Sequence, residues 1–176
     1  MVKIVTKLMT ENDCYKAGRT IVPRGITIHS TAEPGIRAAD WFDLWNKPAS
    51  EQNGREVCVH AFLDDAGVMQ YLPWDMRGWH AGGSDNNDHI STQTCEPPHM
   101  AYWTEFDIVG YDAAAQQPYF DQIWQNAVEL CVFLIGQFPT ISVDEIVSHR
   151  EGFARGTASG HMDPEHWWQF HNRTMD

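Results

Sequence analysis

Alternating apolar and polar residues predict five short strands separated by turns and helices. The second and third strands are joined by Asp64-Asp65-Ala66-Gly67, and this short connection predicts a hairpin. The remaining strands are bounded by turn residues or by helical patterns. The five predicted strands cover residues 25–29, 57–63, 68–72, 90–95 and 145–149.

Two helices follow from the three-to-four-residue spacing of apolar positions. The shorter covers residues 36–45, with Ala39, Phe42 and Trp45 facing inward. The longer begins after Pro118, a residue suited to a first helical turn. Its inward face consists of apolar side chains at Phe120, Ile123, Trp124, Ala127, Cys131, Leu134, Ile135 and Phe138.

A hairpin combined with strands that helices separate is typical of an α/β domain whose mixed β-sheet is flanked by helices. Residues 96–117 show no regular period and are expected to be irregular. The length of 176 residues fits one domain, so we expect residues 1–176 to form a single unit.

The net charge of the chain limits the classes of molecule that it is expected to bind. The chain has 24 Asp and Glu against 12 Lys and Arg, a formal net charge of −12. Nucleic-acid binders need basic surface to displace counterions, and anionic membranes attract basic segments, so we expect neither partner. The first residues contain no apolar core typical of a secretory signal. Without a signal, the four cysteines are expected to remain thiols.

Histidine is the residue type that points to chemistry, with nine in the chain. His29 and His149 end two predicted strands, and a polar loop after His149 carries His161, Asp163 and His166. Side chains from separate strands converge where strands end. Catalytic zinc takes three protein ligands and leaves a fourth position open. Two strand-end histidines and a loop carboxylate would meet that requirement, although a single such histidine is more often structural.

The sequence resembles zinc-dependent N-acetylmuramoyl-L-alanine amidases of the type-2 family, which share their fold with peptidoglycan recognition proteins. The similarity extends to catalytic domains of endolysins and autolysins from phages and prophages of Gram-positive bacteria. It covers nearly the whole chain. The segments that carry it are CYKAGRTIVPRGITIHST, WNKPASEQNGREVCVHAFLDDAG, LPWDMRGWHAGGSDNNDHIS, TCEPPH, YFDQIWQNAVELCVFL and VSHREGFARGTASGHMDPEHWW.

The resemblance implies a zinc site formed by His29, His149 and Asp163. The residue two positions before the third ligand stabilises the developing oxyanion, and here it is His161. A histidine must be protonated or donate an N–H to do so, and we therefore expect activity to be more pH-sensitive than with lysine.

One position departs from the family pattern. Where the family has a catalytic glutamate, in a strand reading roughly I-G-x-E-x-C-E-P, this chain has Gln93. Glutamine can position water but cannot accept its proton. Three explanations stay open: an engineered inactivating change, a natural variant with weak activity, or replacement by another acid. The candidate acids are Glu96, Glu105 and Glu151, and strand alternation places Glu96 on the opposite face from Gln93.

Aromatic and histidine side chains of the segment LPWDMRGWHAGG are candidates for substrate contact, because indole rings pack well on sugars and peptides. We expect Trp74, Trp79 and His80 to contribute to a binding groove, with core packing an equal alternative for Trp74.

The resemblance implies zinc-dependent hydrolysis of the amide between N-acetylmuramic acid and L-alanine in peptidoglycan, weakened by Gln93. The alternative is a catalytically silent, zinc-containing module that binds peptidoglycan. A third interpretation, a cysteine amidase, would resist chelators. We expect synthesis in the cytoplasm of a host bacterium and action on the cell wall after release.

Overall fold

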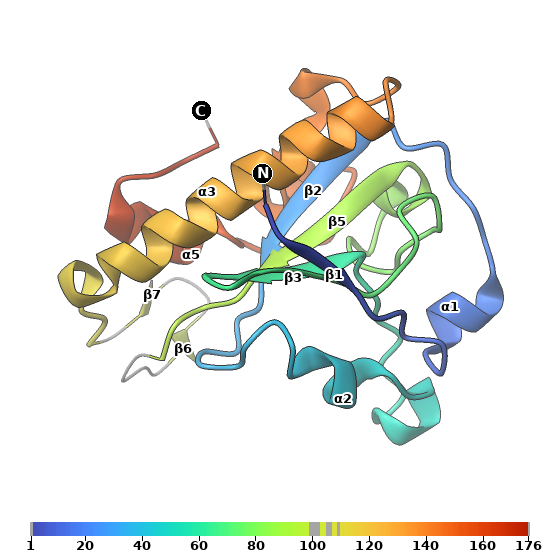
Figure 1. The fold of residues 1–176 in the computed structure, drawn as a ribbon, viewed down its shortest axis with the longest axis horizontal. Helices are drawn as coiled ribbons and strands as arrows, with labels where there is room; N and C mark the ends of the chain where they lie inside the picture. Colours follow the sequence, from blue (N-terminus) through green and yellow to red (C-terminus); the bar gives the residue numbers. More distant parts are fainter. Residues whose placement is uncertain (1, 99–102, 105–106, 109, 176) are drawn as a thin grey trace.

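The structure, a computed structural model, describes residues 2–98, 103–104, 107–108 and 110–175. Its centre is a six-stranded mixed sheet (Figure 1). Neighbouring strands are parallel except for the β3–β4 hairpin. From one edge to the other the strands are β1 (Ile4–Thr6), β4 (Gly67–Gln70), β3 (Ala61–Asp64), β5 (His89–Thr94), β2 (Gly25–Ser30) and β8 (Ile146–Ser148).

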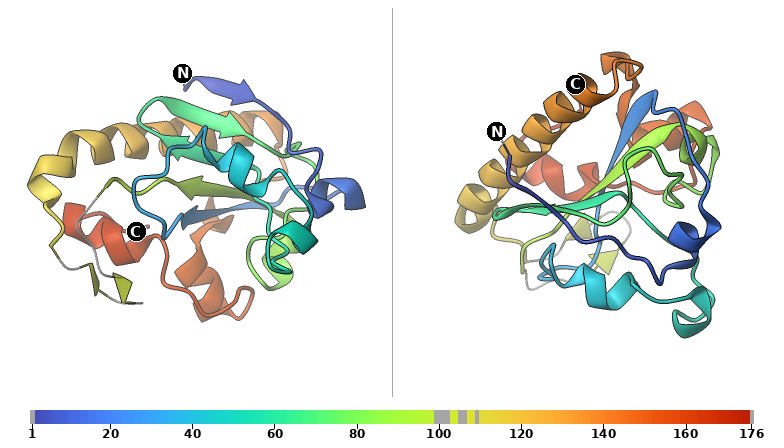
Figure 2. Two further views of the ribbon diagram at one scale, coloured as in Figure 1. Left: turned by 90° about the horizontal axis from the view of Figure 1, so that it is seen from below. Right: turned by 45° about the vertical axis from the view of Figure 1, so that its right-hand side comes forward.

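Two layers of apolar side chains cover the two faces of this sheet. On one face, Ile26 and Ile28 of β2 and Ile90 of β5 pack against the long helix α3 (Ala113–Gln137). On the other face, Phe62 of β3 contacts the aromatic rings of α2 (Trp41–Trp45). Figures 1 and 2 show α3 on one side of the sheet and α2 on the other. The odd-numbered residues of β2 and β5 therefore point away from α3.

The remaining elements are short. They are α1 (Asp13–Ala17), α4 (His149–Arg155), α5 (Glu165–Trp168) and a small hairpin of β6 (Trp103–Thr104) and β7 (Asp107–Ile108), with single 3-10 turns at Ala49–Glu51, Ser84–Asn87, Val143–Glu145 and Gln169–His171. Among the described residues, no helix combines the length and apolar character needed to cross a bilayer.

The mixed sheet flanked by helices confirms the predicted architecture, and the hairpin lies where the turn signal placed it. Several bounds differ from the prediction by one residue or more. The second predicted strand, residues 57–63, corresponds to β3, which begins only at Ala61. The residues before it lie outside the sheet as assigned, and Cys58 pairs with Trp79 instead. The shorter predicted helix, residues 36–45, is observed only as α2, Trp41–Trp45. The last strand ends at Ser148, so that His149 begins a helix.

The long helix differs most from its prediction. It begins at Ala113, five residues before Pro118, and the side chain of Asp112 caps it by accepting the Ala115 N–H. Its buried face includes Leu130, while Cys131 is only half-buried. The strand β1 had no alternating signal long enough to be recognised, because it has only three residues.

A buried polar contact ties the C-terminal segment to the sheet. Glu96, which follows β5, accepts hydrogen bonds at Oε1 from His166 Nε2 of α5, at 3.0 Å, and from the Ala32 amide, at 3.2 Å. Both side chains are almost fully buried, at 0% and 4% exposure. The contact fixes α5, and with it the loop that precedes α5, against the end of β5.

We expect His166→Ala to lower the free energy of unfolding by about 3 kcal/mol, because it leaves the buried Glu96 carboxyl without its side-chain partner. His166→Gln retains a donor and should cost about 1 kcal/mol, the worth of an ordinary hydrogen bond. Urea denaturation of both variants measures the difference. Equal losses would show that His166 acts through packing alone.

Candidate metal centre

Three side chains from separate segments converge at the carboxyl ends of the central parallel strands. His29 lies near the end of β2, His149 is the first residue of α4, and Asp163 precedes α5. The two histidine Nδ1 atoms are 3.0 Å apart. Asp163 lies 3.1 Å from His29 Nδ1 through Oδ2 and 3.3 Å from His149 Nδ1 through Oδ1. These atoms could hold one metal ion.

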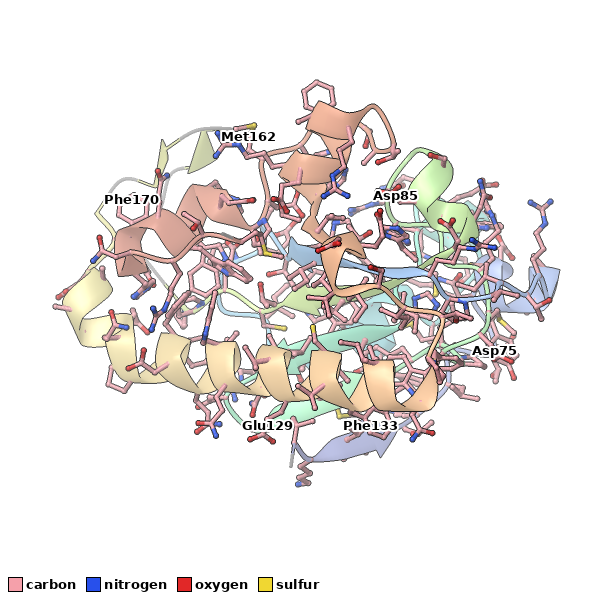
Figure 3. The ribbon with its side chains drawn as sticks, turned by 90° about the horizontal axis from the view of Figure 1, so that it is seen from above. Asp75, Asp85, Glu129, Phe133, Met162 and Phe170 are labelled. Carbon is pink, nitrogen blue, oxygen red and sulfur yellow. The ribbon has the colours of Figure 1, made fainter. Side chains whose placement is uncertain are left out.

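Local structure explains how His149 and Asp163 come to this point. Ser148 caps α4: its Oγ accepts the Glu151 N–H, and the Glu151 carboxylate accepts the Ser148 N–H. The same hydroxyl donates to the Glu165 carboxyl of α5. One serine thus joins the helix that His149 begins to the helix that Asp163 precedes. Figure 3 shows Met162, next to Asp163, on the side of the molecule away from Glu129 and Phe133 of α3.

The protonation states suit metal binding. Burial lowers the pKa of His29 and outweighs the opposite effect of Asp163. Burial alone would raise the pKa of Asp163, but hydrogen bonds from His149 and His29 bring that pKa well below its usual range. A neutral imidazole and an ionised carboxylate are the forms in which these side chains bind metals.

The donor set fits zinc. Ligand atoms about 2.0–2.1 Å from a tetrahedral zinc lie roughly 3.3 Å from one another, close to the separations observed. Two buried polar atoms nearby, Gln93 Oε1 and His80 Nε2, have no hydrogen-bond partner within the described part of the chain. Orphaned polar atoms beside three converging donors are the signature of a site that takes a further polar group.

His80 contacts a candidate ligand directly. Its Nδ1 lies 3.0 Å from His29 Nε2. With His29 Nδ1 turned to a metal, His29 Nε2 carries the proton and donates it to His80, the kind of partner that orients metal-binding histidines. Burial holds the pKa of His80 well below its usual range, so this ring stays a neutral acceptor. The sequence predicts that His80 contacts substrate, and the structure also brings its ring against His29.

Gln93 lies beside the same centre. Its Cα is in register with that of His29 across the β2–β5 ladder, and both side chains point away from α3. Gln93 lines the same hollow of about 250 Å³ as His29, His149 and Asp163. The geometry therefore puts the amide where the resemblance expects a carboxylate.

Two of the three candidate substitute acids are engaged in contacts away from Gln93. Glu96 is bonded to His166, and Glu151 completes the helix cap at Ser148. Glu105 lies outside the described residues. Among the described residues that line the hollow, Asp163 is the sole carboxylate.

A second, larger hollow of about 640 Å³ adjoins the first, and Arg55, Val57, His80 and His161 line both. We call this larger hollow the arginine basin, because Arg19, Arg55 and Arg77 line it with Glu56 as the lone acid among its described lining residues. Trp79 also lines it. Trp74 lines neither hollow, and its ring is stacked 6.4 Å from that of the buried His60.

His161 is exposed and lies at the junction of the two hollows, with its ring 4.6 Å from that of His149. Ser159 stands between them: its Oγ is 3.2 Å from His149 Nε2 and 3.0 Å from His161 Nδ1. Sequence analysis missed Ser159, because a serine in a loop rich in Gly, Ser and Thr carries no distinguishing pattern.

Comparisons with known proteins agree with this geometry. The N-acetylmuramoyl-L-alanine amidase family Amidase_2 matches residues 18–166. The Bacillus subtilis N-acetylmuramoyl-L-alanine amidases CwlH and XlyA are 32% and 31% identical over 100 and 101 residues, 54% of this chain in each case. Those matches span only 39% and 32% of the two relatives, so the chain corresponds to a minor part of their length.

Solved structures support the fold. The Staphylococcus aureus hydrolase AmiA aligns with a TM-score of 0.67 at 19% identity, covering 98% of this chain and 77% of that one. A mutant form of PlyL aligns with a TM-score of 0.62 at 20% identity, covering 96% of this chain and 95% of that one. Because the family match extends over most of the chain, the chain belongs to the N-acetylmuramoyl-L-alanine amidase family.

Proposed function

We propose that this chain is a zinc-dependent amidase that cleaves the bond between N-acetylmuramic acid and L-alanine in peptidoglycan. The observation that carries the proposal is the convergence of His29 Nδ1, His149 Nδ1 and the Asp163 carboxylate within 3.0–3.3 Å in a member of the amidase family. Names of the curated relatives support the amide bond as the target.

In this proposal, His29, His149 and Asp163 hold Zn²⁺, and His80 fixes the ring of His29. A bound zinc polarises a carbonyl and lowers the pKa of water toward roughly 7. His161 donates an N–H to the oxygen that gains charge when the amide carbon is attacked. Gln93 orients the attacking water through its amide but does not take its proton, which is why the expected activity is weak.

The arginine basin suits an anionic part of the substrate. Arg37 and Arg155 are paired with carboxylates, whereas no ion pair is found for Arg19, Arg55 or Arg77 among the described residues. In a chain of net charge −12, three such arginines beside the metal centre favour a carboxylate of the peptide stem. Arg55 lines both hollows and would contact the stem closest to the scissile amide.

Replacement of a ligand tests the metal centre. We expect His149→Ala to lose its bound zinc and to reduce lysis of Gram-positive walls by more than about 100-fold, beyond what loss of a supporting partner costs. Metal analysis and a turbidity assay measure both. Asp144→Asn removes an exposed carboxylate that lines neither hollow and serves as the control. Full lysis by His149→Ala would exclude the mechanism.

Position 93 determines how active the chain is. We expect Gln93→Glu to raise the rate of wall lysis at least about tenfold, a threshold set below the roughly 10²–10⁴-fold that a general base contributes. The comparison also separates the explanations for Gln93. High activity in both proteins would show that another acid accepts the proton. Zinc binding without lysis in either would favour the silent peptidoglycan-binding module.

The arginine basin leads to a separate prediction, which concerns the affinity for substrate. We expect Arg55→Ala to raise KM for a soluble muropeptide about tenfold while kcat changes little, since a charge-assisted hydrogen bond to a non-reacting group contributes to binding. Arg155→Ala removes the same charge from an arginine paired with Glu145 and should leave KM unchanged. A lowered kcat with normal KM would place Arg55 at the reacting atoms instead.

A further inference from the structure

Ser159 occupies a position that the proposed mechanism does not use. Its backbone N–H donates to the Ala81 carbonyl at 2.7 Å, which anchors the 157–161 loop beside Gly82. Gly82 has a φ of +63°, and a Cβ built there would lie 2.8 Å from Ser159 Oγ. Only a glycine allows the hydroxyl to come so close at this backbone angle.

The number of hydrogens on His149, Ser159 and His161 indicates which atom donates in each hydrogen bond between them. When His149 Nδ1 offers its lone pair to a metal, its proton is on Nε2, which lies 3.2 Å from Ser159 Oγ and donates to it. The serine hydroxyl has a single hydrogen, and among the described residues His161 Nδ1, at 3.0 Å, is the other side-chain atom within reach that can accept it. The hydroxyl therefore donates to Nδ1, and the proton of a neutral His161 ring is on Nε2.

We propose that Ser159 is a positioning residue that links the metal ligand His149 to His161 and holds His161 with its Nε2–H available to the substrate. This inference rests on the proposed function, because the direction of the hydrogen bonds follows from a metal at His149 Nδ1. No hydrogen-bond partner is found for His161 Nε2 among the described residues, and His161 lines both hollows.

The consequence concerns how His161 stabilises an oxyanion. A lysine in this place would act as a fixed charge. A histidine held by Ser159 acts as an N–H donor of fixed direction, which costs no reorganisation during the reaction. The same contact keeps the His149 ring in the orientation that metal binding requires.

A double-mutant cycle distinguishes this role from a merely structural one. The cycle uses zinc-saturated protein and a soluble muropeptide, in whichever of the wild-type and Gln93→Glu chains cleaves faster. We expect Ser159→Ala to lower kcat about tenfold, part of the 10²–10³-fold effect of a complete oxyanion donor. In a His161→Asn background the same substitution should change kcat by less than about twofold, because Ser159 no longer has a histidine ring to orient. Equal losses in both backgrounds would overturn the proposal.

Rescue of kcat tests whether the hydroxyl carries the effect. Ser159→Thr keeps the hydroxyl and should restore most of the kcat lost in Ser159→Ala. A threonine variant as slow as the alanine variant would show that the hydroxyl is not responsible.

Two readouts do not depend on turnover. In the zinc-loaded protein at about pH 9, well above the ordinary histidine pKa, ¹⁵N NMR should find His161 protonated at Nε2 and not at Nδ1. The His161→Asn spectrum assigns the signals. Chelator competition should show that Ser159→Ala weakens zinc binding about tenfold while Ser159→Thr does not. A proton on Nδ1 would overturn the proposal even in an active zinc enzyme, whereas a chain that binds no zinc would overturn the proposed function itself.

Discussion

Three largely buried polar side chains, His29, His149 and Asp163, meet with separations of 3.0–3.3 Å between the members of each pair, an arrangement that costs the desolvation of all three. The fold imposes it. Parallel pairing of β2 with β8 brings the two histidines to one edge of the sheet. Ser148 then joins α4 to α5, and Glu96 holds α5 through His166, so that Asp163 is positioned by contacts outside the hollow. In the proposed function, a metal ion bound by the three side chains would compensate that cost.

Strand periodicity was enough to predict the architecture and to place His29 at a strand end, since a buried strand leaves a clear alternating pattern. The position of His149 was predicted to within one residue, the difference being that it begins α4. Asp163 depended on family resemblance, because a loop residue has no periodic signature. Ser159, the contact between His80 and His29 and the arginine basin could not be predicted, because each arises from segments brought together only by tertiary packing.

The register of β2 and β5 makes position 93 a neighbour of the metal centre whatever residue stands there. In this chain the neighbour is neutral, and the described lining of the hollow offers Asp163 as its sole carboxylate. Negative charge in the hollow is thus concentrated on Asp163, while three arginines line the adjoining basin. In the proposed function, the acidic group that holds the metal is thereby separated from the basic groups that bind an anionic substrate, although the chain as a whole is strongly acidic.

The loops that carry Gly82 and Ser159 meet more closely than side chains permit. A Cβ at the adjacent Gly83 would lie 2.1 Å from the Thr157 carbonyl oxygen, so two successive positions exclude every other residue without a shift of backbone. Neither glycine has a side chain that could take part in catalysis, yet any replacement would require the segment bearing Ser159 and His161 to shift. The two glycines therefore act on the proposed site from outside it: a substitution at either would displace Ser159 and His161 while leaving the hydrophobic core intact.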